Sequence, residues 1–460
     1  MSTRQDSAPA PTVRSRDALI AWIAAGSKPV ERWRIGTEHE KFLFLADTLR
    51  PVPYAGPHSV RALMESLIAR FGWLPIMEGD NIIALKRPDG EAGGTVSLEP
   101  GGQFELSGDP LRTVHEVGAE THNHLSQCLD VGSPLGIGFL GVGFSPTWTQ
   151  AETPRMPKQR YEVMTRYMPK VGERGLDMMY RTATIQVNLD FADEADMVKK
   201  FRVSLALQPV ATAIFACSPF TEGRPNGFLS LRSEVWRDTD RNRTGMLPFV
   251  FEPGMSFARY VDYALQVPMY FVYRGGRYID AAGASFADFM AGRLPQLPGE
   301  LPTEDDWSDH LTTLFPEVRM KRFLEMRGAD GGRWRRICAL PALWTGLLYD
   351  PTSLDAAWDL VKDWTADERQ ALRNAVPRTA LRTPFRGTTV LEVARQALAI
   401  AEAGLKRRAC IDAAGRDESI FLEPVEAILR SGLTPAEEIL ARYDGEWGRS
   451  VAPLFREYAF

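Results

Sequence analysis

Polar and apolar residues alternate without a break along the stretch Thr184-Ile185-Gln186-Val187-Asn188-Leu189-Asp190-Phe191. A β-strand directs successive side chains to opposite faces, so this alternation predicts a strand with one apolar and one polar face. The apolar face belongs in a hydrophobic core, and the polar face carries Gln186 and Asn188. These two amides are therefore candidates to bind a metal ion or a substrate.

Three further segments alternate in the same way: Gly36-Thr37-Glu38-His39-Glu40, Gln103-Phe104-Glu105 and Leu324-Glu325-Met326-Arg327. Each places two polar or charged side chains on one face of a short strand. Glu99 precedes the sequence Pro100-Gly101-Gly102, which should kink or bulge the strand predicted over 95–106. If these strands share one sheet, their polar faces form an acidic floor.

Such a floor would bind metal. A single glutamate on a strand is most often a solvated surface residue, and that alternative applies to Glu38 taken alone. Together, however, the acidic residues lie beside glycine or apolar neighbours, where an unpaired charge is costly. Oxygen ligands in this number suit Mg²⁺ that bridges phosphates rather than a soft transition metal.

Basic residues follow in the segment from Glu317 to Arg327, which we predict to be one strand. Arg319, Lys321 and Arg327 share a face of that strand with Glu325. They could clamp the phosphates of a nucleotide, although a plain surface position remains the alternative for Arg319 and Lys321.

Composition limits the function classes. The chain has 460 residues, of which 44% are hydrophobic and 25% charged, and its 54 basic and 59 acidic side chains give a net charge of −5. This slightly acidic balance argues against a nucleic-acid partner. Apolar segments are too short to span a membrane. The polar start, residues 1–14, lacks a signal peptide and predicts a disordered tail, so we expect a cytosolic protein.

Other motifs are not convincing. Gly136-x-Gly138-x-x-Gly141 fits a dinucleotide fingerprint, but Phe144-Ser145-Pro146 follows where a helix is needed, so a buried strand is expected. His115-Glu116 resembles a zinc motif that lacks its second histidine. The four cysteines are widely scattered and predict reduced thiols.

The last third of the chain changes character. From Trp334 onward the pattern is helical, with capping-box starts at Thr365-x-x-Glu368 and Thr434-x-x-Glu437. No internal repeat or low-complexity linker divides the chain. We therefore expect one α+β domain over residues 15–460, with a helical C-terminal third.

At this point the motifs resemble those of glutamate–cysteine ligases of the plant and proteobacterial type. The resemblance covers the chain from about Trp33 to Gly448. The motifs that carry it are Gly36-Thr37-Glu38-His39-Glu40-Lys41, Glu99-Pro100-Gly101-Gly102-Gln103-Phe104-Glu105-Leu106-Ser107-Gly108, Asp177-Met178-Met179-Tyr180-Arg181 leading into Gln186-Val187-Asn188-Leu189-Asp190-Phe191, and Leu324-Glu325-Met326-Arg327-Gly328-Ala329-Asp330-Gly331-Gly332.

The resemblance implies a curved antiparallel sheet flanked by helices, related to glutamine synthetase. It also implies a reaction in which ATP, L-glutamate and L-cysteine give γ-glutamylcysteine, ADP and phosphate, the first step of glutathione synthesis. The resemblance further implies Mg²⁺, or Mn²⁺, as the cofactor, held between the ATP phosphates and the substrate carboxylate. The chain would be a monomer or a homodimer that binds small molecules. Alternatives are a sister ligase that uses another amine, a silent binding protein and a metal-dependent hydrolase.

The resemblance also assigns roles to residues. Metal ligands would be Glu38, Glu40, Glu99, Glu105, Gln186 and Glu325. Substrate contacts would be Arg160, Arg232, Tyr270, Gln186 and Asn188, of which the first three match the glutamate pocket. Arg319, Lys321 and Arg327 would contact the ATP phosphates, and Arg327 and Glu325 would be catalytic.

Overall fold

The computed structural model describes residues 10–88 and 94–460. Most of the expected N-terminal tail, residues 1–9, lies outside the described residues. The end of that segment is packed: Thr12 pairs with Thr303, and Val13 is buried. The tail over 1–14 was therefore predicted too long, because Val13 finds an apolar site in the main core.

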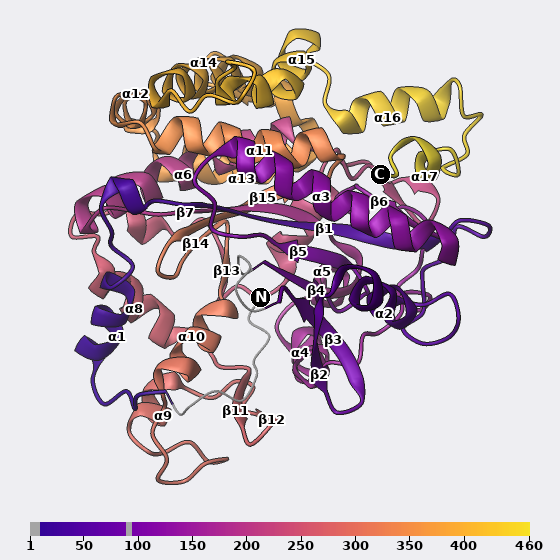
Figure 1. Ribbon diagram of the computed structural model, residues 1–460. Helices are drawn as coiled ribbons and strands as arrows, with labels where there is room; N and C mark the ends of the chain where they lie inside the picture. Colours follow the sequence, from indigo (N-terminus) through magenta and orange to yellow (C-terminus); the bar gives the residue numbers. More distant parts are fainter. Residues whose placement is uncertain (1–9, 89–93) are drawn as a thin grey trace.

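A nine-stranded sheet forms the centre of the molecule (Figure 1). Its strand order is β14-β15-β7-β1-β5-β4-β3-β2, and β6 pairs with the second half of β1. Every pairing in this sheet is antiparallel. The strands are β1 (Ile35–Leu45), β2 (Leu74–Glu78), β3 (Asn81–Lys86), β4 (Thr95–Leu98), β5 (Phe104–Ser107), β6 (Ile137–Leu140), β7 (Thr184–Leu189), β14 (Val318–Met320) and β15 (Leu324–Asp330).

The four segments with alternating polarity thus become neighbouring strands, as the sequence predicted. Two details differ. The segment from Glu317 to Arg327 is a hairpin of β14 and β15 rather than one strand, because the chain turns between Lys321 and Phe323, where the Lys321 N–H donates to the Phe323 carbonyl (2.9 Å). Likewise, the Pro100-Gly101-Gly102 break reverses the chain completely, so that β4 and β5 also form a hairpin.

Helices surround the sheet. They are α1 (Arg16–Ala24), α2 (Val60–Phe71), α3 (Val114–Gly132), α4 (Gln159–Tyr167), α5 (Gly175–Arg181), α6 (Glu194–Ile214), α7 (Leu231–Val235), α8 (Phe257–Gln266), α9 (Phe286–Met290), α10 (Glu304–Thr312), α11 (Trp334–Leu348), α12 (Pro351–Val361), α13 (Ala366–Thr379), α14 (Val390–Arg408), α15 (Glu423–Ser431), α16 (Pro435–Asp444) and α17 (Leu454–Glu457). Two-residue strands pair as β8 (Phe220–Thr221) with β9 (Arg224–Pro225), β10 (Thr244–Gly245) with β13 (Phe315–Pro316), and β16 (Pro384–Phe385) with β17 (Thr388–Thr389), and the longer β11 (Phe271–Arg274) pairs with β12 (Arg277–Asp280).

One face of the sheet is covered by two layers of helices. Helices α3, α6 and α11 pack directly on the strands, and α12, α14 and α15 lie outside them (Figure 1). The apolar face of β7 supplies Ile185, Val187 and Leu189, each no more than 1% exposed, to the core beneath these helices. The predicted α+β fold and helical C-terminal third are confirmed, and the capping boxes at Thr365 and Thr434 are both formed.

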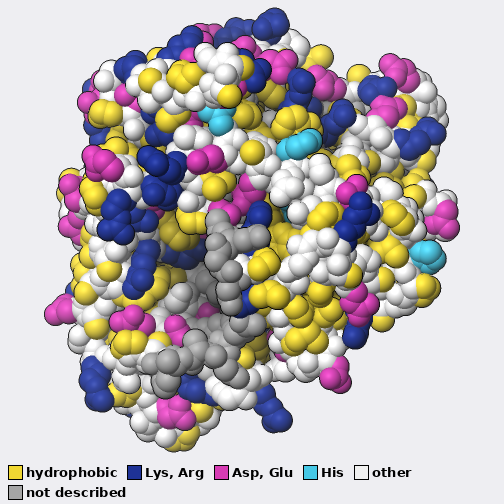
Figure 2. Space-filling model, viewed as in Figure 1, with side chains coloured by type: hydrophobic (Ala, Val, Ile, Leu, Met, Phe, Trp, Pro, Cys, Tyr) yellow, Lys and Arg dark blue, Asp and Glu magenta, His cyan; other side chains and the backbone are white. Residues whose placement is uncertain are grey.

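None of the helices in the described part of the chain combines the length and the apolar character that a membrane span needs. Acidic and basic side chains are both spread over the face seen in Figure 2. All four cysteines carry free thiols, as expected.

The turn between β4 and β5 has no room for a side chain at Gly101. A Cβ atom there would lie 2.2 Å from the backbone carbonyl of Tyr180. We expect Gly101→Ala to lower the free energy of unfolding by about 1–3 kcal/mol, because backbone atoms cannot yield as a flexible side chain can. Denaturant unfolding measures this. Gly94→Ala is the control, since its Cβ would meet atoms no closer than 3.5 Å, and an equal loss in both variants would contradict the steric explanation.

Candidate active site

The polar residues of the sheet face each other across neighbouring strands. The register pairs Glu105 with Glu40, Glu38 with Gln186, Asn188 with Glu325, and Glu325 with Arg319. Directly paired residues in antiparallel strands share a face. A continuous polar row therefore runs from β5 to β14, which confirms the acidic floor predicted from the alternation.

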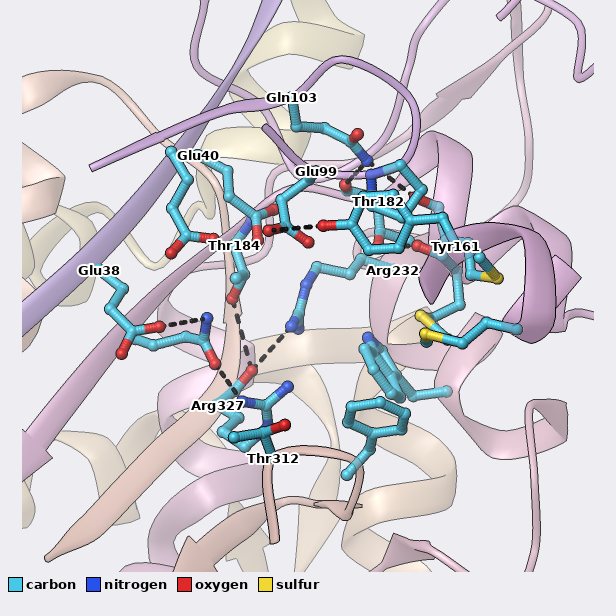
Figure 3. A pocket seen from close by; sticks show the side chains of 18 of the residues that line it. Glu38, Glu40, Glu99, Gln103, Tyr161, Thr182, Thr184, Arg232, Thr312 and Arg327 are labelled. Carbon is cyan, nitrogen blue, oxygen red and sulfur yellow. Dashed lines mark hydrogen bonds between the residues drawn. The ribbon is translucent and has the colours of Figure 1, made fainter. Parts of the chain in front are cut away.

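A cleft lies over this row (Figure 3). Its polar wall consists of Glu38, Glu40, Glu99, Gln103, Glu105, Thr182, Thr184, Gln186, Arg232, Thr312, Arg319 and Arg327. Its apolar wall consists of Pro100, Tyr161, Met164, Met178, Met179, Trp236 and Phe315. The cleft therefore combines a charged floor with a sulfur-rich and aromatic side.

Three carboxylates form a tight group at one end. Oxygen atoms of Glu40, Glu99 and Glu105 lie within 4.8 Å of one another. Desolvation, with repulsion from Glu105 added, raises the pKa of Glu99 to about 8, and desolvation with both neighbouring carboxylates raises the pKa of Glu40 well above its usual value. Carboxylates held this close either keep protons or share a cation, and their hard oxygen donors fit Mg²⁺ or Mn²⁺.

Positive charge collects at the other end around Glu325, which is fully buried. Arg319 donates two hydrogen bonds to its carboxylate, Nε to Oε2 (2.9 Å) and Nη2 to Oε1 (2.8 Å). The Lys321 ammonium lies 3.2 Å from Oε2, and Arg327 also pairs with Oε1. These cations hold the pKa of Glu325 well below its ordinary value despite burial. Glu325 is thus not part of the three-carboxylate group; it anchors the cations.

Amide side chains connect the two ends. Glu38 accepts hydrogen bonds from Asn188 Nδ2 (2.9 Å) and Gln186 Nε2 (3.3 Å). The Gln186 carbonyl oxygen accepts from Arg327 Nη1. This chain of hydrogen bonds fixes the position of Glu38 between the carboxylate group and the arginines.

The three residues predicted for the glutamate pocket do not lie together, since only one of them lines the cleft. Arg232 lines the cleft, is 2% exposed, and donates from Nη2 to the Arg327 carbonyl (2.8 Å). Arg160 is buried behind the wall, with its guanidinium 4.9 Å from the centre of the Phe271 ring. Tyr270 points away from the cleft: its hydroxyl contacts Met168 Sδ (3.6 Å), because its ring packs in a local core beneath Arg243.

Several cleft residues were not predicted. Tyr161 donates to the Leu98 carbonyl (2.9 Å) and lies 3.4 Å from Glu99 Oε1, so it supports the carboxylate group. Helix α5 brings Met178 and Met179 to the apolar wall. Those methionines belong to a motif that carries the family resemblance, which was the available signal. Nothing in the local sequence around Trp236 predicts its place in the cleft.

The fold and the cleft define an α+β enzyme whose active site occupies one face of an antiparallel sheet. The chain belongs to glutamate-cysteine ligase family 2, since that family's model matches residues 34–457. It is 57% identical over 446 residues to the chloroplastic glutamate–cysteine ligase of Brassica juncea, covering 97% of this chain and 84% of that protein. The Arabidopsis thaliana enzyme is also 57% identical, with 97% and 83% coverage.

A solved structure shares the fold. It is a glutamate–cysteine ligase from Francisella tularensis in complex with AMP, with a TM-score of 0.52 and 14% identity over 93% of this chain and 89% of that one. The relatives also correct one expectation. The cytosolic location expected from the sequence is contradicted, because the relatives from Brassica juncea, Oryza sativa and Arabidopsis thaliana are chloroplastic enzymes.

The cation cluster gives a stability prediction. Glu325→Gln removes the buried charge that balances Arg319, Lys321 and Arg327, so we expect a loss of about 3–5 kcal/mol in the free energy of unfolding. Glu38→Gln is the matched control, because Glu38 accepts hydrogen bonds from two neutral amides and should lose roughly 1 kcal/mol. Denaturant unfolding of both variants compares them, and a similar loss would contradict the assigned role of Glu325.

The carboxylate group gives a pH prediction. Folded Glu99 binds its proton more tightly than the unfolded chain does, so without divalent cations the melting temperature should fall as the pH rises from 4.5 to about 8. Glu325 shifts in the opposite direction and loses its contribution only as the pH falls below that range. Thermal melts with a chelator and with Mg²⁺ test this: Mg²⁺ should remove the decline, and Glu99→Gln should weaken it. A decline that is equal with and without Mg²⁺ would disprove it.

Proposed function

We propose that this chain joins L-glutamate to L-cysteine at the expense of ATP, giving γ-glutamylcysteine, ADP and phosphate as the first step of glutathione biosynthesis. The observation that carries the proposal is the single cleft that combines a three-carboxylate group with an arginine cluster, in a chain of this family. A catalytically silent relative would have no need to retain both charged ends. A hydrolase would need no nucleotide.

The chemistry requires both ends of the cleft. A carboxylate is a poor electrophile. An oxygen of the γ-carboxylate of L-glutamate therefore first accepts the terminal phosphoryl group of ATP, and ADP leaves. The cysteine amine then attacks the γ-carbonyl carbon, and phosphate leaves as the amide bond forms. Both steps bring anions together, so Arg319, Lys321 and Arg327 would stabilise the phosphate charge through positioning and electrostatics.

Glu40, Glu99 and Glu105, with Glu38 and Gln186 beside them, are the residues that would hold Mg²⁺ or Mn²⁺. Such ions, when bound, supply charge neutralisation for the ATP phosphates. Glu325 was predicted as a further ligand, but its carboxylate already pairs with three cations. We therefore propose that Glu325 orients Arg319 and Arg327 and does not bind the metal ion.

Arg232 is the best candidate to bind a carboxylate of L-glutamate. It is a buried guanidinium in the cleft wall whose Nε has no hydrogen-bond partner among the described residues. Buried donors without partners are costly, and a substrate carboxylate would satisfy this one. Arg160 and Tyr270 would shape this wall from behind, and Asn188 would act through Glu38.

The apolar wall suits the side chain of cysteine. Met164, Met178 and Met179 offer polarizable sulfur atoms, and Phe315 and Trp236 offer ring surfaces. Soft, apolar surroundings favour a thiol over a hydroxyl, which would lose its hydrogen bonds to water there. A sister ligase that accepts another amine remains the second candidate.

Because strands and helices from Glu38 to Arg327 build one cleft beneath the C-terminal helices, we also propose a single catalytic domain over 15–460.

The test is phosphate release by the purified protein with ATP, Mg²⁺ and L-glutamate, with and without L-cysteine, and mass spectrometry of the product. We expect cysteine-dependent release, the mass of γ-glutamylcysteine, and turnover with L-serine reduced by about tenfold or more, the order that a buried, unpaired hydroxyl costs. Glu40→Gln should lower turnover at least a hundredfold. Release without any amine would indicate a hydrolase, and preference for another amine would indicate a sister ligase.

A further inference from the structure

A lysine is buried directly behind the carboxylate group. Lys41 follows Glu40 on β1, so its side chain leaves the opposite face of the sheet, where helix α3 packs. It is 0% exposed, and its ammonium lies 2.9 Å from His39 Nδ1 and 3.0 Å from His124 Nε2. The proposed reaction does not use it.

Among the residues that the structure describes, those around the Lys41 ammonium are neutral. Burial lowers the pKa of both His39 and His124 well below its usual value, so these rings are neutral acceptors. Burial also raises the pKa of the nearby Cys128 thiol to about 12, so this group is neutral too. Phe104 lies opposite Lys41 on β5. Among the described residues, no carboxylate forms an ion pair with this ammonium.

Another buried lysine shows what an ordinary arrangement looks like. Lys200 on α6 is also 0% exposed, but its ammonium lies 2.9 Å from Asp196 and 3.4 Å from the centre of the Trp33 ring. Its charge is balanced within its own layer. Lys41 therefore differs from Lys200 in lacking a local counter-ion, although burying an unpaired ammonium costs several kcal/mol.

The acids nearest to Lys41 lie on the other face of the sheet. Glu40 is the preceding residue, and Glu105 stands opposite Glu40 in the register. Burial has the largest effect on Lys41 and lowers its pKa to about 8, while Cys128, Glu105 and Glu40 each oppose that lowering. Of these three groups, the two carboxylates lie across the strand from the ammonium. In a dry, low-dielectric layer such an interaction stays strong over several ångströms.

We propose that Lys41 is a positioning residue for the metal site: its buried ammonium behind β1 offsets the charge of Glu40, Glu99 and Glu105 and limits their affinity for a divalent cation. This rests on the proposed function insofar as that group must hold a cation. A group of three close carboxylates would otherwise bind the ion tightly. With Lys41 behind it, the ion can exchange as nucleotide enters and leaves.

The test is Mn²⁺ binding to the full chain without substrates at near-neutral pH, followed by the electron paramagnetic resonance of free Mn²⁺. Lys41→Met and Lys41→Gln both remove the charge, and Gln keeps a hydrogen-bond donor for one histidine. We expect Mn²⁺ to bind about tenfold more tightly to both variants, because 1.4 kcal/mol of repulsion corresponds to that factor. Lys41→Arg retains the charge and should bind Mn²⁺ as the unchanged protein does.

Lys200→Met is the matched control. It should lower the melting temperature and leave the Mn²⁺ affinity unchanged, since its charge is balanced by Asp196. Unchanged or weaker Mn²⁺ binding in the neutral Lys41 variants would overturn the proposal. The proposal would also be overturned if Lys41→Met and Lys41→Gln both failed to fold while Lys41→Arg folded, because Lys41 would then have only a structural role in the core.

The outcome is separable from the proposed reaction. If the unchanged protein binds Mn²⁺, Glu40→Gln abolishes binding, and the Lys41 variants bind more tightly, the inference holds even when no ligase activity is found. If the unchanged protein does not bind Mn²⁺, or if Glu40→Gln leaves its Mn²⁺ binding intact, the inference is wrong, whatever the ligase assay shows.

Discussion

Repulsion among like charges is the constraint on which this active site depends. Three carboxylates converge to within 4.8 Å on the floor of the cleft, and three cations converge on Glu325 a few strands away. Neither group could persist on flexible loops, since each would spread apart in water. The antiparallel ladder fixes their spacing, and helices packed beneath it keep that ladder rigid.

The sequence predicted this floor well because strand alternation is a local property. Residues two apart on one strand share a face, so Glu38 and Glu40, or Gln186 and Asn188, could be grouped from the sequence alone. That the strands would be neighbours was a hypothesis, and the register confirms it. The helical C-terminal third was likewise visible from apolar spacing and capping residues.

What the sequence did not predict depends on contacts between distant segments. Alternation cannot tell a single strand from a tight hairpin, so the turn between β14 and β15 was missed, and with it the direct pairing of Arg319 with Glu325. Tyr270 was expected in the cleft, yet whether its hydroxyl meets a substrate or Met168 is decided by core packing. The apolar wall combines residues of α4, α5 and the segments that carry Trp236 and Phe315, which no local pattern relates.

The separation of charge along the floor also restricts how substrates can lie. In the proposed reaction, nucleotide phosphates are repelled by the three-carboxylate group and attracted by Arg319 and Arg327. The arginines alone therefore do not fix the position of the terminal phosphoryl group. Cations between the two ends would do so, because they are attracted to both phosphate and carboxylate oxygens. In that arrangement the glutamate γ-carboxylate would lie beside Arg232, and the amine would lie along the methionine wall. Such apolar surroundings would hold the amine in its neutral, nucleophilic form more readily than water does, because desolvation disfavours the charged ammonium.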